Sequence, residues 1–190
     1  MRLHKLVGDN ISPHTLDQVE FVPHHYANVY IRESNIGFER LRIGLADKHV
    51  EFMLNMVEIL LPDFFLLYVL HAPHVHEAAR YQSPPLQRED VQSFLAHFHE
   101  FLTEDARHDL WLFSKTDNAT LVWDRHDLLY AYGPLQQFQR VLQTWSVAKG
   151  DPQVPVPHSH PYYPEYDEQE KEVVGCFDWI VSPLRPEDQE

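Results

Sequence analysis

The sequence predicts an α+β fold, in which a single mixed β-sheet packs against about three α-helices. The 190 residues are 44% hydrophobic, which is enough to bury a sizeable core in one domain. Segments with the two-residue period of strands are interspersed with segments that have the 3.6-residue period of helices. Their order, β-β-α-β-α-β-β-β-α, ends in a run of strands that must pair antiparallel, and this order is typical of the α+β class.

An N-terminal hairpin is the first predicted element. Residues 24–31 and 38–45 are rich in strand-forming residues, and turn-forming residues at 34–37 separate them. In the second strand Leu41, Ile43 and Leu45 alternate with polar or small residues. This strand therefore has one buried face and one polar face.

A helix and a buried strand follow the hairpin. After Asp47, apolar residues recur at helical spacing until Leu61, and Pro62 ends the helix. Residues 64–70 are continuously apolar, as expected for a strand covered on both faces. This central strand is predicted to lie in the middle of the sheet.

The next elements are a second helix, a β-meander and a third helix. The apolar stripe of the second helix runs from Val91 to Leu102, and Pro134 opens the third helix at a position where its missing N–H does no harm. The three strands of the meander are predicted at 109–114, 119–124 and 127–132.

The domain organisation is predicted to change at Gly150. Residues 1–149 form the compact α+β domain, and residues 150–164 contain five prolines that favour an extended chain. The segment 173–181 is too apolar to stay in solvent. Residues 150–190 are therefore predicted to be an extended, Pro- and Tyr-rich segment whose last part docks back on the domain as a strand or a short helix.

Charge and composition exclude several classes of partner. Fifteen Lys and Arg against 29 Asp and Glu give a net charge of −14, which repels nucleic acids and anionic membranes. The longest apolar run, 64–70, is far shorter than the roughly 20 residues of a transmembrane helix. Cys176 is the only cysteine, and the N-terminus lacks the apolar run of a secretory signal. A cytoplasmic location is predicted.

The 14 histidines make the net charge unusually sensitive to mild acid, because histidine titrates near pH 6.5. Complete protonation of these side chains would cancel the net charge of −14. We therefore expect poor solubility near the isoelectric point of 5.3. Light scattering across this pH range tests the prediction, which fails if the protein stays monodisperse at its isoelectric point.

The strongest candidate site is a metal centre at the end of the central strand. His71, His74, His76 and Glu77 leave this strand together, and imidazole is the commonest metal ligand in proteins. Such a set could hold zinc, iron or manganese. The spacing does not match a His-Glu-x-x-His motif, since Arg80 stands where the second histidine would be. The alternative is a surface loop that happens to be rich in histidine.

Two weaker motifs contain further histidines. His158-Ser159-His160 could complete a site with His74 and His76 if the C-terminal segment folds over the domain; the favoured alternative is a solvated extended spacer. The stretch from Asp124 to Asp127 offers two carboxylates, a cation and His126 for acid–base chemistry. Its position between two predicted strands favours a simple turn.

Other familiar chemistry is missing from the sequence. There is no Gly-x-Ser-x-Gly nucleophile motif, and all six glycines stand alone, so neither a phosphate-binding loop nor a dinucleotide fingerprint can be assembled. Cys176 lies in an apolar run, which favours an inert thiol. No catalytic residue and no organic cofactor is predicted.

The favoured functional hypothesis is a non-catalytic protein-binding module, similar in kind to inhibitors or immunity proteins, that binds a basic protein. Aromatic residues dominate interface energetics, so the predicted contact residues are Tyr162, Tyr163, Tyr166 and Trp179. The alternative for these four is packing of the C-terminal segment on its own domain. A homodimer that buries Trp111 and Trp123 is a further possibility. The competing hypothesis is a metal-dependent hydrolase or oxygenase that uses His71, His74, His76 and Glu77.

Overall fold

A computed structural model describes residues 2–7 and 20–189, and it confirms the α+β class. Residues 8–10, which are part of the N-terminal stretch used to predict a cytoplasmic location, lie outside the described residues. The large sheet has nine strands in the order β10-β3-β4-β9-β8-β7-β5-β6-β12, and a small sheet has three in the order β11-β1-β2. The strands are β1 (His4–Val7), β2 (Glu20–Pro23), β3 (Val29–Asn35), β4 (Phe38–Gly44), β5 (Phe64–Leu70), β6 (Ala79–Gln82), β7 (His108–Ser114), β8 (Ala119–Trp123), β9 (Leu128–Tyr132), β10 (Ala148–Lys149), β11 (His158–Ser159) and β12 (Ile180–Ser182).

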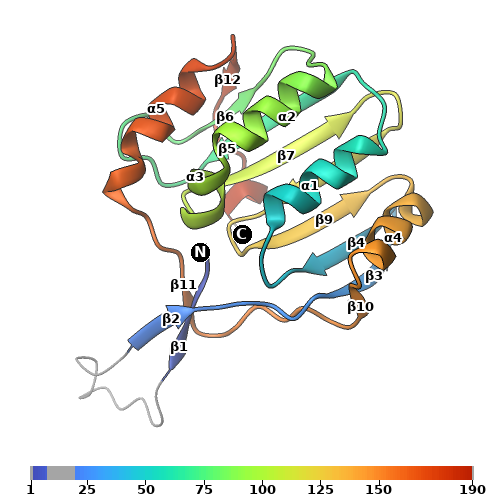
Figure 1. Cartoon of the computed structure of the whole chain (residues 1–190). Coiled ribbons are helices and arrows are strands. Elements are labelled where there is room, and N and C mark those ends of the chain that lie inside the picture. Colours follow the sequence, from blue (N-terminus) through green and yellow to red (C-terminus); the bar gives the residue numbers. More distant parts are fainter. Residues whose placement is uncertain (1, 8–19, 190) are drawn as a thin grey trace.

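The helices gather on one face of the large sheet (Figure 1). They are α1 (His49–Glu58), α2 (Arg88–His97), α3 (His99–Glu104), α4 (Leu135–Thr144) and α5 (Asp167–Gly175), with the short 3-10 helix η2 (Pro164–Tyr166). A second 3-10 helix, η3 (Pro186–Gln189), lies on the other face, where Asp188 pairs with Arg80 and the Arg80 guanidinium lies over the Trp111 ring. Even-numbered side chains of β5 and β7, such as Leu66 and Leu112, point into the core beneath the helices. Odd-numbered ones, such as Phe65 and Trp111, are half-buried. The core therefore lies between one sheet face and the helical layer.

The sheet confirms most of the longer predicted elements. β3 and β4 form the N-terminal hairpin, and β7, β8 and β9 form the meander. β5 has the predicted bounds but lies between β7 and β6, so the middle position of the large sheet belongs to β8. β9, the last strand of the meander, pairs antiparallel with β4, the second strand of the hairpin. This pairing joins the hairpin and the meander into one sheet.

Other features of the fold also differ from the predictions. A small second sheet is present where a single sheet was predicted. The segment between the central strand and the second helix contains β6, which was not predicted and which pairs with β5 and with β12. The second predicted helix is divided into α2 and α3 at Phe98. The sequence does not signal this break, because Phe94, Phe101 and Leu102 stay on the buried side across it.

The C-terminal segment packs against the rest of the chain. Arg107 is fully buried, and its guanidinium contacts Asp105 at 2.8 Å, Glu170 at 2.6 Å and Asp167 at 3.0 Å. Its Nη2 also donates a hydrogen bond of 2.9 Å to the carbonyl of Tyr163. Farther along, β12 adds to the edge of the large sheet. Buried charge and strand pairing together hold this segment in place.

Candidate metal centre

The turn between β8 and β9 is fixed by its own aspartates. The Asp124 carboxylate accepts the N–H of Leu128 at 2.9 Å, and Asp127 adopts a left-handed φ of 63°, which aspartate tolerates better than most residues. The indole N–H of Trp123 donates to the Asp127 carboxylate at 2.9 Å. The turn predicted from this sequence is therefore present, and it presents His126 at its tip.

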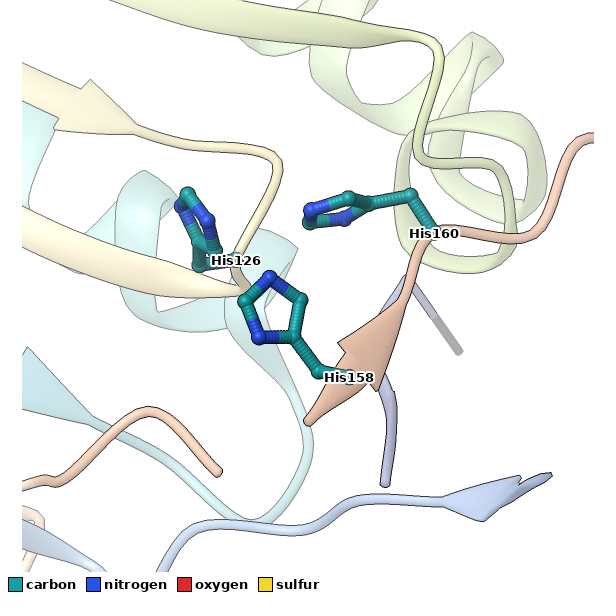
Figure 2. Close-up of side chains that lie close together, drawn as sticks. All are labelled: His126, His158 and His160. Atoms are coloured by element: carbon teal, nitrogen blue, oxygen red, sulfur yellow. The ribbon is translucent and has the colours of Figure 1, made fainter. Parts of the chain in front are cut away.

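Strand β11 supplies the second half of the centre. It pairs with β1, with His158 opposite Lys5 and Ser159 opposite His4. Alternate residues of an extended chain point to the same side, so His158 and His160 project together. Figure 2 shows both rings directed toward His126 from the neighbouring turn.

The three imidazoles form one half-buried cluster. One ring nitrogen from each of His126, His158 and His160 can be chosen so that all three lie within 4.8 Å of one another. In a tetrahedral zinc site with Zn–N bonds of about 2.05 Å, ligand nitrogens lie roughly 3.3 Å apart. Small ring movements would therefore complete such a site. Across residues 2–7 and 20–189, this is the one group of three or more His, Cys, Asp or Glu side chains with metal-binding geometry.

The hydrogen bonds of the cluster define which nitrogen of each ring is free. Nδ1 of His158 lies 2.9 Å from the Pro155 carbonyl, and Nδ1 of His160 lies 3.0 Å from the Arg125 carbonyl. A carbonyl only accepts, so both Nδ1 atoms carry the proton. Nδ1 of His126 faces an Asp124 carboxylate oxygen at 3.3 Å. Each neutral ring therefore keeps its lone pair on Nε2, which is the arrangement found in metal-binding histidines.

The environment keeps His160 neutral at physiological pH. Burial lowers the pKa of His160 to about 4, and the nearby positive charges of His126, His158 and Arg125 act in the same direction. Only a neutral imidazole can donate a lone pair to a metal. His160 can therefore act as a metal ligand throughout the neutral pH range.

A second layer of contacts supports the turn. Asp109 accepts the backbone N–H of Arg125 at 2.7 Å, and its other carboxylate oxygen lies 3.0 Å from Nε2 of His71. Burial raises the pKa of Asp109, but the contacts with His71 and Arg2 outweigh it and hold the pKa below its usual value. The Arg125 carbonyl in turn accepts from His160. Asp109 therefore links His71 to the metal-binding cluster through one residue of the turn.

If the histidine cluster binds zinc, replacing Asp109 by alanine is expected to weaken that binding by roughly 3- to 10-fold, less than the loss of a direct partner of a ligand, because Asp109 reaches His160 only through the backbone of Arg125. The reason is that Arg125 loses the partner of its N–H and no longer holds His160 in register. Zinc titration against a competing chelator measures the change. The exposed Asp178→Ala variant is the control, and equal affinities in the two variants would contradict this role for Asp109.

The loop that was predicted to bind metal instead surrounds a carboxylate. The backbone N–H groups of His74, Val75 and His76 donate to Glu170 at 3.2, 3.1 and 3.0 Å. The His74 ring lies 3.0 Å from Asp167, and the His76 ring 3.2 Å from Glu170.

The four predicted ligands of this loop are thus directed to different places. His71 contacts Asp109, while His74 and His76 contact α5. Glu77 is exposed, and its carbonyl accepts from Tyr81. The structure does not bring His71, His74, His76 and Glu77 into one group, and His158 and His160 meet His126 rather than His74 and His76.

The cradle around Glu170 predicts a pH-dependent stability. Burial alone would raise the pKa of Glu170, but hydrogen bonds from Arg107 and the loop amides lower it to about 2, from 4.5. The stabilisation is complete above pH 4.5 and is lost as the pH falls toward 2. Urea unfolding at several pH values across this window should show the loss. A Glu170→Gln variant should show a shallower dependence, and an unchanged slope would contradict the assignment.

The predicted partner-binding residues divide into two groups. Tyr166 and Trp179 pack against the core of their own domain. Tyr163 is half-buried, and its backbone N–H donates to Asp105. Tyr162 is 42% exposed. Of the two residues proposed for a dimer interface, Trp123 is fully buried between His49 and Arg2, which corrects the expectation that it is exposed.

The sequence analysis named both halves of the candidate centre as weaker motifs, favoured a spacer for one and a simple turn for the other, and did not predict that they meet. A His-x-His pair in an extended segment was the available signal for one half, and a histidine in an aspartate-rich turn was the signal for the other.

Comparison of the chain with protein-family models, curated proteins and solved structures finds no match. Within the described residues, no helix has the length and apolar character needed to cross a bilayer.

Proposed function

We propose that His126, His158 and His160 bind a divalent metal and that the protein is a metal-dependent hydrolase. The observation that supports the proposal is the convergence of three imidazoles whose Nδ1 atoms are all occupied by hydrogen bonds to oxygen. Structural zinc sites use four protein ligands, whereas catalytic ones use three and keep a position for water. Three histidines therefore favour catalysis.

The donor set favours zinc over the other metals considered. Three neutral nitrogen donors suit zinc, whereas manganese prefers oxygen ligands and non-haem iron oxygenases use two histidines with one carboxylate. The nearest carboxylate, that of Asp124, contacts Nδ1 of His126 and so occupies the outer sphere. A hydrolase is therefore favoured over an oxygenase.

The residues of the site would bind the metal and hold its coordination geometry, while the metal would supply a bound water with a pKa near 7. His158 and His160 would supply two ligands from one extended segment, and His126 would supply the third from the turn. Asp124 and the carbonyls of Pro155 and Arg125 hold the rings in the metal-binding tautomer. The neutral rings leave the full positive charge of the metal available to polarise water.

The test combines metal content with a generic reaction. Untagged protein should contain about one zinc per chain, and a chelator should lower its melting temperature. Zinc-loaded protein should hydrolyse p-nitrophenyl acetate faster than the His126→Ala variant at the same zinc concentration. Absence of zinc binding would reject the metal centre. Zinc binding with equal hydrolysis by both proteins would reject the hydrolase and leave a metal that only fastens β11 to the turn.

A second proposed function is binding of a basic protein partner in the cytoplasm. The net charge of −14 favours rapid association with a cationic partner, and the single cysteine suits a reducing compartment. An apolar groove with carboxylates on its walls, between α2 and α5, is the specific observation that favours this function.

A further inference from the structure

A surface groove separates α2 from the end of α5. Its volume is about 660 Å³. Phe94 and Phe98 contribute from α2 and its C-terminal cap, and Phe177 contributes from the chain that follows α5.

The floor of the groove is aromatic. The rings of Phe94 and Phe98 lie 5.0 Å apart, and the ring of Phe177 stacks on Phe94 at 5.9 Å. Gly175 borders the groove, and a side chain added at this position would meet no atom within 4 Å. Phe94 and Phe98 are each only 4% exposed, so the half-buried Phe177 offers most of the aromatic surface of the floor, and Gly175 leaves room beside it.

The thiol in the groove is not a nucleophile. Cys176 donates a hydrogen bond to the Val173 carbonyl at 3.0 Å, and burial raises its pKa to about 11. A thiol with such a pKa is protonated at neutral pH and unreactive. Binding, rather than covalent chemistry, is the use that this groove supports.

The charges on the walls of the groove are negative. Asp90 lies on α2 and Glu172 on α5, and no Lys or Arg is among the described residues that line it. Asp90 accepts the Gln87 N–H at 2.8 Å and Glu172 lies 3.2 Å from Nε2 of His97, but both carboxylates stay exposed to solvent. Arg88, the arginine of α2, is held by the carbonyls of Val57 at 2.7 Å and Leu60 at 2.8 Å. Lys171 is paired with Glu168 at 2.6 Å. The neighbouring cations are thus already engaged.

We propose that this groove binds a basic amphipathic helix of another protein. An apolar stripe of the partner would lie on Phe177 and the open surface beside Gly175, and flanking Lys or Arg side chains would approach Asp90 and Glu172. The whole-chain charge of −14 attracts such a segment before contact. The inference rests on the second proposed function, for which it names the surface and the partner chemistry, and it does not depend on the metal centre.

The probe is a fluorescent helical peptide of Leu and Lys, about 14 residues or about 21 Å long. Two peptides serve as comparisons: one with Glu in place of Lys, and one with the same Leu and Lys in scrambled order. Fluorescence anisotropy with the full chain should show saturable binding of the amphipathic cationic peptide and much weaker binding of the other two. Addition of a chelator should leave this binding unchanged.

Matched variants locate the binding surface. Glu172→Lys and Gly175→Lys should weaken binding at least about tenfold, because each places a cation in the groove. Glu168→Lys makes the same charge change on α5 outside the groove, and Gly175→Ala adds a methyl group without charge; both should change affinity less than about threefold. Melting temperatures confirm folding of each variant.

Two outcomes would overturn the inference. Equal weakening by Glu168→Lys and Glu172→Lys, or equal binding of the scrambled peptide, would show attraction by overall charge without a groove; the second proposed function would then survive without this surface. No binding of any cationic peptide would reject both the groove and the second proposed function.

Discussion

Replacement of Arg107 by methionine is expected to lower the free energy of unfolding by about 3–5 kcal/mol, the usual cost of removing one partner from a buried ion pair. The side chains of Arg107, Asp105 and Glu170 are all fully buried. Methionine keeps much of the volume but leaves two carboxylates in the interior without their cation. Urea unfolding followed by circular dichroism measures the loss.

The control for this prediction is an exposed ion pair. Arg32 contacts Glu39 at 2.7 Å, with about half of each side chain exposed, so Arg32→Met should change stability by no more than about 1 kcal/mol. Arg107 also bonds to the Tyr163 carbonyl, and its loss should expose residues 160–175 to proteolysis before global unfolding. Similar stabilities of the two variants would contradict the central role of Arg107.

The parts of the fold that the sequence predicts are those with a long regular pattern. β5 was predicted with the correct ends because seven consecutive apolar residues lie between a proline and a histidine-rich loop. The meander was predicted because its turns contain polar residues at the right spacing. In each case the signal is local, so one sequence suffices to read it.

The elements that escaped prediction are short and depend on partners. β10, β11 and β12 have two or three residues each, too few to show a period. They are strands because a neighbouring edge offers hydrogen bonds, as β1 does for β11. Pairing across distant parts of the chain cannot be read from one segment alone.

The candidate site was missed for the same reason. His126 and His158 are 32 positions apart, and only the path of residues 150–164 across the domain brings them together. The loop at 71–77 has the denser run of histidines in the sequence and so was the stronger local signal for a metal site. Its conformation, however, is organised by hydrogen bonds from its backbone N–H groups to Glu170. An acidic residue within the polar stretch Asp167–Glu172 looks solvent-exposed in the sequence, and its burial follows from the distant Arg107.

Replacement of His160 by alanine is expected to weaken zinc binding by more than about 100-fold, beyond the effect of an outer-sphere residue. The substitution removes the His160 ring together with its bond to the Arg125 carbonyl, so only two of the three histidine ligands remain. Isothermal titration calorimetry at neutral pH measures the affinity. Wild-type protein with free zinc at about 100 times the Kd should gain about 2.7 kcal/mol of stability, and the variant should gain almost none.

Two histidine controls separate the possible sites. His97 is 66% exposed on α2 and contacts Glu172, so His97→Ala should bind zinc as the wild type does. His74 belonged to the ligand set predicted from sequence, and its ring contacts Asp167. Loss of zinc binding in His74→Ala with retention in His160→Ala would move the metal to the loop at 71–77. The converse result would assign it to His126, His158 and His160, because among the described residues these three imidazoles are the group that lies within reach of one ion.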